Sequence, residues 1–157
     1  MAVFKFRLEK ILGLRVRAEE QAAQALGRLL SQRLAWLQDL VRMRADKGLL
    51  LEIRNELQRG RVEPERLAQN RYQVIVLERA ITRLQAELQE LDRRVASAQD
   101  ELAERRRDRK LLDKLEERRR DEFDLEERRR EQKESDELPR KHHGTEIALP
   151  PTRKHRG

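Results

Sequence analysis

The sequence predicts an all-α fold, a long antiparallel coiled-coil hairpin made of two helices. Charged residues make up 43% of the 157 residues and aromatic residues 3%, which excludes a thick globular core. Glycine, at six residues, and proline, at four, are scarce, as in chains that form long helices. Apolar residues recur three and four positions apart in two long stretches, which is the repeat of paired helices.

The second stretch carries the clearest repeat. Its nine positions are all apolar and are spaced alternately three and four residues apart. The mean period of 3.5 predicts a helix that supercoils left-handedly around a partner helix. These positions, named here the second seam, are Val74, Leu77, Ile81, Leu84, Leu88, Leu91, Val95, Ala98 and Leu102.

A matching repeat lies upstream and is named here the first seam. Seven of its nine positions are apolar, and weaker continuations lie at Leu8 and Leu12. The partner helix is therefore expected within the same chain. The first seam consists of Ala22, Leu26, Leu29, Arg33, Trp36, Leu40, Met43, Lys47 and Leu50.

Between the seams, Gly60 and Pro64 indicate a reversal of the chain. Glycine tolerates the left-handed conformation that often follows a helix, and proline is favoured in the first turn of the next one. The sequence therefore predicts a first arm at about residues 3–59, a turn at 60–64 and a second arm at about 65–137.

Pairing about this turn places position i opposite position 124 minus i, so that the two seams meet. The apolar pairs that result are Leu50 with Val74, Met43 with Ile81, Trp36 with Leu88, and Leu29 with Val95. Three glycines, Gly13, Gly27 and Gly48, interrupt the first arm, whereas residues 61–143 contain none. Because glycine weakens a helix interior, the first arm should be the more flexible one.

The second seam decays towards the end of the second arm. From position 105 onward its frame is occupied by Arg105, Arg109, Glu116 and Arg119, while Leu111 and Leu115 stand one position out. This pattern predicts a register shift followed by a mostly solvated helix. The hairpin is expected to occupy residues 1–137, and the aperiodic, basic residues 138–157 are expected to form a disordered tail.

A two-helix rod offers no pocket in which polar groups converge, so no enzyme activity, catalytic residue, cofactor or small-molecule substrate is expected. The chain has no cysteine. A metal site made by His142, His143 and Glu146 is not expected either, because these residues fall in the predicted tail and structural metal sites need an ordered frame. The sequence shows no signal peptide and no apolar run that could cross a bilayer, which makes the cytoplasm the expected location.

The net charge of +7 raises the question of nucleic acid. Arginine triplets stand at 105–107, 118–120 and 128–130, and acidic residues precede them by four positions. Such pairs stabilise a solvated helix, and residues 103–137 carry a net charge of −1, so no nucleic-acid partner is expected. A protein-docking surface stays open for this segment. The expected pairs are Glu101 with Arg105, Glu116 with Arg120, Asp124 with Arg128, and Glu126 with Arg130.

A second apolar row runs beside the first seam and is wider than a two-stranded coiled coil requires. This flanking row consists of Leu30, Leu34, Leu37 and Val41. Two interpretations stay open: the row thickens the hairpin core, or it is a docking face for a partner.

The N-terminus is more specific than the coiled coil that follows. Residues 4–15 read Phe-Lys-Phe-Arg-Leu-Glu-Lys-Ile-Leu-Gly-Leu-Arg, and Glu19 and Glu20 follow them. Two aromatic residues around a basic one, with a Leu-Arg step that leads into an acidic helix, resemble the opening of the flagellar export protein family FliJ. Residues 72–81 look like that family's segment after the turn.

The resemblance implies a cytoplasmic component of the flagellar type III export apparatus, at the cytoplasmic face of the inner membrane and similar to the central stalk of rotary ATPases. The implied partners are the hexamer of the export ATPase FliI, whose assembly and activity such a protein promotes, the cytoplasmic domain of the export gate FlhA, and export chaperones. The stalk protein of needle-type secretion systems and a basic hairpin that binds nucleic acid are the alternatives.

The resemblance also assigns two contact regions. The region that would enter the ATPase pore is the free end of the hairpin, with Phe4, Phe6, Leu8, Ile11, Leu112, Arg118, Arg119 and Phe123. The region that would contact the export gate consists of Gln73, Leu77, Ala80 and Leu84. Leu77 and Leu84 also belong to the second seam, so their exposure decides whether they can bind a partner.

Overall fold

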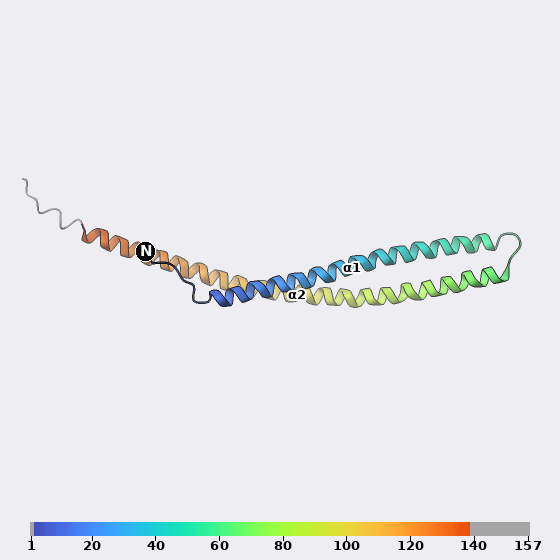
Figure 1. Ribbon diagram of the computed structural model, residues 1–157, viewed down its shortest axis with the longest axis horizontal. Coiled ribbons are helices and arrows are strands. Elements are labelled where there is room, and N and C mark those ends of the chain that lie inside the picture. Colours follow the sequence, from blue (N-terminus) through green and yellow to red (C-terminus); the bar gives the residue numbers. More distant parts are fainter. Residues whose placement is uncertain (1, 139–157) are drawn as a thin grey trace, which may run out of the picture. The chain divides into compact units, whose positions relative to one another are not determined.

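Two long helices joined by a short turn make up residues 2–138, the part of the chain that the computed structural model describes (Figure 1). Helix α1 spans Glu9–Leu57 and helix α2 spans Pro64–Glu137. Residues 2–138 contain no strand, so the prediction of an all-α fold built on two helices is confirmed. Apart from Leu138, the expected tail lies outside the described residues.

The chain divides into two units. Unit 1 comprises Met1–Glu9 and Leu112–Gly157, and unit 2 comprises Lys10–Leu111. Unit 2 therefore holds both seams, and unit 1 holds the start of the N-terminal motif with the charged end of α2.

The reversal between the helices lies where the sequence predicts it. Gly60 has a φ of +75°, the left-handed conformation that glycine adopts without a steric penalty. Before it, the amide of Gln58 donates to the carbonyl of Arg54 at 3.0 Å and ends α1. Pro64 is the first residue of α2, where its missing N–H leaves no helical hydrogen bond unmade. The interpretation of both Gly60 and Pro64 is confirmed.

Helix α1 begins at Glu9, six residues later than the expected start near residue 3. The amide of Glu9 donates to the carbonyl of Phe6 at 3.2 Å, which closes a turn ahead of the helix. Phe4 and Phe6 line the same hollow. Two residues that are two positions apart share a face in an extended segment but not on a helix, so this packing favours a non-helical start.

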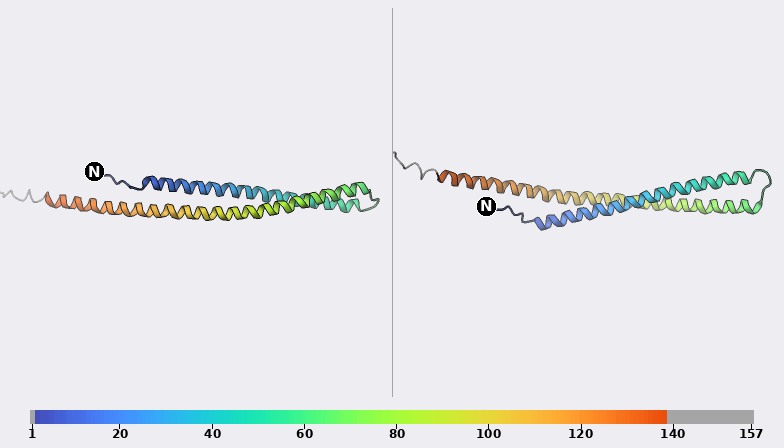
Figure 2. Two further views of the ribbon diagram at one scale, coloured as in Figure 1. Left: turned by 90° about the horizontal axis from the view of Figure 1, so that it is seen from below. Right: turned by 45° about the horizontal axis from the view of Figure 1, so that its top comes forward.

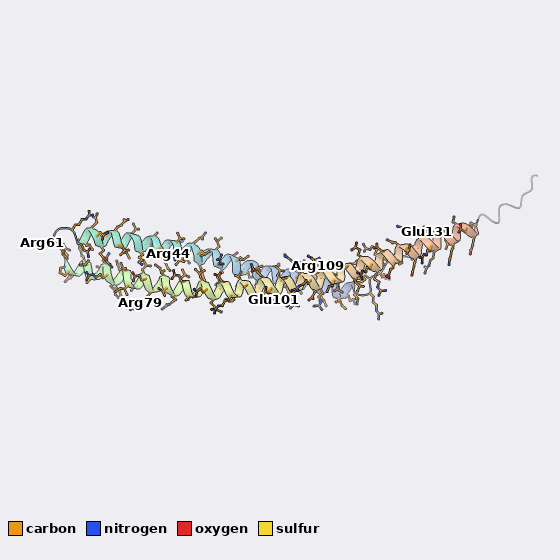
Figure 3. The ribbon with its side chains drawn as sticks, turned by 180° about the vertical axis from the view of Figure 1, so that it is seen from behind. Arg44, Arg61, Arg79, Glu101, Arg109 and Glu131 are labelled. Carbon is orange, nitrogen blue, oxygen red and sulfur yellow. The ribbon has the colours of Figure 1, made fainter. Side chains whose placement is uncertain are left out.

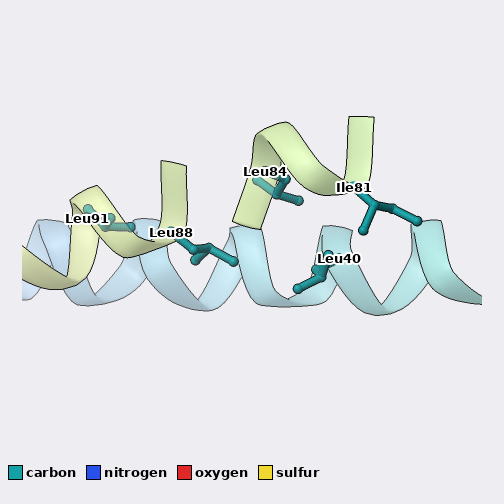
Figure 4. Close-up of a cluster of buried hydrophobic side chains, with 5 residues drawn as sticks. All are labelled: Leu40, Ile81, Leu84, Leu88 and Leu91. Atoms are coloured by element: carbon teal, nitrogen blue, oxygen red, sulfur yellow. The ribbon is translucent and has the colours of Figure 1, made fainter. Parts of the chain in front are cut away.

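In unit 2, α1 and α2 lie side by side and cross over one another along their length (Figure 2). Seven residues of the second seam are buried, and the other two, Leu77 and Ala98, are partly buried. Every residue of the first seam is buried or partly buried. Figure 4 shows the centre of this core, where Leu40 of α1 faces four residues of α2. These four are Ile81, Leu84, Leu88 and Leu91.

Ion pairs between the helices of unit 2 report their register. Each of three pairs joins positions within one residue of the expected pairing, so the predicted register is confirmed. They are Arg33 with Asp92 at 2.6 Å, Lys47 with Glu78 at 3.3 Å, and Arg15 with Asp108 at 3.6 Å.

The predicted register shift near the end of the second seam fails at Leu111, although Leu115, the other leucine on which it rested, is partly buried. Leu111, which the shift would bury, is 68% exposed. The original frame continues instead through Arg105, Arg109 and Leu112, all partly buried. Arginine can occupy such positions because its aliphatic stem packs against the partner helix while its guanidinium group reaches a carboxylate at the edge.

Candidate protein-binding surfaces

The N-terminal motif folds onto α2 within unit 1 through aromatic contacts. The ring centroids of Phe4 and Phe123 lie 5.6 Å apart with the planes tilted by 56°, a favourable geometry for an aromatic pair. The guanidinium carbon of Arg120 lies 5.3 Å from the Phe4 centroid, within range of a cation–π interaction. Arg120 also donates to the carboxylate of Glu116 at 3.3 Å, which orients its head group. Residues 2–8 are therefore attached to α2 by specific contacts.

A hollow of about 820 Å³, named here the N-terminal hollow, lies between this segment and α2. It combines aromatic and aliphatic side chains with both acidic and basic ones. This is the composition of a protein-binding pocket with an apolar centre and a polar rim. The lining residues are Val3, Phe4, Lys5, Phe6, Arg7, Leu8, Leu115, Arg119, Glu122, Phe123 and Glu126.

The structure brings five of the eight residues assigned to the ATPase pore together at this hollow. They are Phe4, Phe6, Leu8, Arg119 and Phe123. Leu112 is partly buried on α2 and does not line the hollow, and Arg118 is exposed. Ile11 belongs to unit 2 and is 43% exposed.

A second hollow, of about 590 Å³, lies between α1 and α2 of unit 2. We name it the tip groove, because its residues flank the turn in sequence. It is mostly apolar, and four large side chains on it are about half exposed or more, which is typical of a surface that binds a partner. The groove is lined by Asp46, Leu49, Leu50 and Ile53 of α1 and by Tyr72, Gln73, Val76, Leu77 and Ala80 of α2.

Three of the four residues assigned to the export gate, Gln73, Leu77 and Ala80, line the tip groove. Leu84 does not, because it is only 8% exposed and packs in the core cluster. Leu77 both lines the groove and packs against that cluster. Leu77 can therefore serve both the core and a contact with a partner, whereas Leu84 serves the core alone.

Sequence reasoning missed the most exposed apolar side chains of the tip groove. Leu49 and Ile53 are 58% and 50% exposed, and Tyr72 and Val76 are 69% and 47% exposed. Each pair is spaced four residues apart and stands outside its seam, so each forms a row beside the core. The predicted register already placed Ile53 within one position of Tyr72, and this was the signal that could have revealed the groove.

The flanking row on α1 is mostly exposed. Leu30, Leu34 and Val41 are 44%, 60% and 67% exposed, and only Leu37 packs against the core cluster. The row therefore adds a single residue to the hairpin core. Its other three residues are available to a partner.

A cluster of charged side chains lies beyond the two seams in unit 2, where Glu19 and Arg109 continue the frames of the seams and Arg106 stands beside them. Glu19, whose side chain is 17% exposed, accepts hydrogen bonds from Arg109 and lies 3.4 Å from Arg106. The hydrogen bond from Arg109 lowers the pKa of the Glu19 carboxyl, and the charges of Arg109 and Arg106 act in the same direction against the opposing effect of burial. An ionic contact replaces the apolar one here. We name these three residues the Glu19 cluster.

The arginine triplets are only partly paired as predicted. Glu101 contacts Arg105 at 3.7 Å and Glu116 contacts Arg120 at 3.3 Å, as expected. Arg130 pairs with Glu127 at 3.5 Å instead of Glu126, since residues three and four apart both lie beside it on a helix. Within the described part of α2, no ion pair joins Asp124 to Arg128. Figure 3 shows charged side chains projecting along both helices.

Sites for other ligands are not evident in the described chain. Residues 2–138 contain no group of three His, Cys, Asp or Glu side chains placed to hold a metal ion. His142, His143 and Glu146 lie outside the described residues. No helix within residues 2–138 combines the length and the hydropathy needed to cross a membrane.

Two paired helices, with one hollow in unit 1 and one in unit 2, define a coiled-coil hairpin with candidate surfaces for protein binding. Residues 4–145 match the family described as the flagellar FliJ protein, and the chain belongs to that family. No curated protein and no solved structure matches the chain. FliJ proteins are non-enzymatic components of flagellar protein export, so membership implies an export-related role.

Proposed function

We propose that this chain is a stalk of the flagellar export apparatus, which binds the hexameric export ATPase, promotes its assembly and turnover, and links it to the export gate. The observation that carries the proposal is the match to the FliJ family over residues 4–145, which includes every lining residue of both hollows except Val3. Export chaperones are a third class of partner that the family supports.

Unit 1 is the proposed contact with the ATPase. Its hollow is built by the N-terminal motif, Phe4 to Leu8, that characterises the family opening. Aromatic side chains there supply apolar area, while Arg119 and Glu122 supply a charged rim of both signs. Such a surface suits the ring of polar and apolar side chains that a protein pore presents.

The tip groove is the proposed contact with the export gate. Gln73, Leu77 and Ala80 line one wall, and the exposed Leu49 and Ile53 line the other. A partner helix or loop with apolar side chains would bury these residues and gain the free energy of removing them from water. Leu84 has no part in this proposal, because it is buried in the core. Contact with the gate would hold the protein at the cytoplasmic face of the inner membrane.

The test is to add the purified chain to its cognate export ATPase and to measure ATP turnover and the fraction of hexamer. Wild type should raise both, and Phe4→Ala should weaken the effect because it removes the contacts with Phe123 and Arg120. The matched control, Ile53→Ser, alters the tip groove and should leave stimulation unchanged while weakening binding to the gate domain. Failure of wild type to change either quantity would reject the proposal.

A further inference from the structure

Asn70 is the one buried polar residue among residues 2–138, with 4% of its surface exposed. It continues the frame of the second seam, because it stands four residues before Val74 and three after Leu67. Arg54 continues the first seam in the same way, four residues after Leu50. A polar layer thus interrupts an otherwise apolar seam close to the turn.

This polar layer is fully hydrogen-bonded. The side-chain amide of Asn70 donates to the main-chain carbonyl of Leu50 at 2.8 Å, and Arg54 Nε donates to the amide oxygen of Asn70 at 3.2 Å. Within residues 2–138, no buried side-chain nitrogen or oxygen lacks a partner. Such a layer is favourable only when the donors and acceptors of α1 lie opposite the amide of Asn70, since a buried amide without partners is costly.

Apolar seams alone do not select a register. A shift of seven residues moves each heptad onto the next and again sets apolar side chains against each other. The polar residues of the first seam behave differently, because each has a single partner: Arg33 contacts Asp92, Lys47 contacts Glu78, and Arg54 contacts Asn70.

A shift by seven residues would break all three contacts. In one direction Lys47 would face Arg71, a like charge, and in the other Arg54 would face Leu77. The Arg33 and Lys47 pairs have side chains that are about one-third to one-half exposed, so solvent weakens them. Asn70 is buried, so its hydrogen bonds favour the native register over a shifted one more strongly than the ion pairs do.

We infer that Asn70 determines the pairing register of α1 and α2, at some cost in stability, and thereby aligns the two walls of the tip groove. A single buried asparagine in a coiled-coil seam is known to act in this way. A shift of seven residues would displace the wall formed by Leu49 and Ile53 by about 10 Å along the wall formed by Tyr72 and Val76. The inference concerns pairing only and does not depend on the proposed partners.

The chain has no cysteine, so engineered pairs report register without background. Asp46→Cys with Ala80→Cys reports the native register, because position 80 lies within two residues of the position expected opposite Asp46. Asp46→Cys with Gln73→Cys, or with Glu87→Cys, reports a shift of seven residues in either direction. Each pair is treated with a short bis-maleimide, and intramolecular product is quantified in the full chain.

With Asn70 present, only the native pair should cross-link. Asn70→Leu should raise the yield of at least one shifted pair tenfold or more, while the urea midpoint stays unchanged or rises. Asn70→Asp, which keeps an acceptor for Arg54, should remain in the native register. Two results would overturn the inference: Asn70→Leu that cross-links only through the native pair, which would mean that Asn70 does not select the register, or Asn70→Leu with a lowered urea midpoint, which would mean that Asn70 carries no cost in stability.

Discussion

The core cluster and the Glu19–Arg109 contact continue the same heptad frames, yet different forces hold them. Around Leu40 and Leu91, apolar side chains are removed from water. Around Glu19, two arginines meet one carboxylate. The frame determines where two helices touch, and the side chains determine under which conditions the contact persists.

The two regions should respond differently to solvent. Apolar contacts strengthen slightly or stay constant as salt is added, whereas ion pairs near the surface are screened. We therefore expect the contact between α1 and α2 to persist at the centre of unit 2 when salt is added, and to weaken around the Glu19 cluster. The largest effects should come from the apolar region.

Leu91 is the most deeply buried side chain, with 1% of its surface exposed. Leu91→Ala should lower the free energy of unfolding by about 3 kcal/mol, because the removed atoms lose apolar contacts and leave a cavity. Urea denaturation followed by circular dichroism measures this loss. Leu111→Ala is the matched control, since Leu111 is 68% exposed and should cost less than about 0.5 kcal/mol. Equal losses for the two variants would mean that the core cluster is not the stabilising centre.

The Glu19 cluster should open in acid. Because its pKa is lowered in the folded chain, Glu19 contributes stability that is present above the ordinary carboxyl pKa and is lost as the pH falls through the lowered value. Hydrogen-exchange protection around Glu19 should therefore fall in acid, and also in about 1 M salt, where the screening length is near 3 Å. Protection around Leu84 should change little.

Glu19→Gln is the control for this effect, because glutamine does not titrate. In that variant, protection near residue 19 should be low at neutral pH and should not decline further on acidification by the same mechanism. Equal losses of hydrogen-exchange protection around Glu19 and Leu84 in the wild type would contradict a different response of the two regions to acid.

The smallest expected effects concern two glycines of α1. A Cβ added at Gly48 or at Gly13 would meet no heavy atom within 4 Å, so alanine fits at both positions. Gly48→Ala should raise the free energy of unfolding by about 1 kcal/mol through helix propensity. Gly13→Ala lies nearer the Glu19 cluster and should raise it less, because that end opens before the rest unfolds. Urea midpoints compare the two, and a larger gain at Gly13 would invert the expected order.

The fold was largely predictable, because the residues that contact one another in a coiled coil recur with a fixed period in the sequence. The positions of the second seam could be derived from spacing, the turn from Gly60 and Pro64, and the register from the two together. The start of α1 could not, because local periodicity does not reveal that Phe4 packs on Phe123 at the far end of the sequence. Nor could the exposure of Leu111, since it depends on arginine stems that substitute for leucine in the seam.

The candidate surfaces were predictable only in part. Resemblance located one wall of the tip groove at Gln73, Leu77 and Ala80, but it also included Leu84, which the core buries. The opposite wall, with Leu49 and Ile53, comes from the other helix and shares no sequence motif with the first. A groove between two helices is a property of their pairing, so it requires the register as well as the residues.

The glycines of α1 have a mechanical consequence. Gly13, Gly27 and Gly48 leave open space where a side chain would fit, so packing does not require them. We therefore expect α1 to bend more easily than α2, which has no glycine from Pro64 to Glu137. Under a load on the paired helices, α1 should bend while α2 transmits the force along its axis.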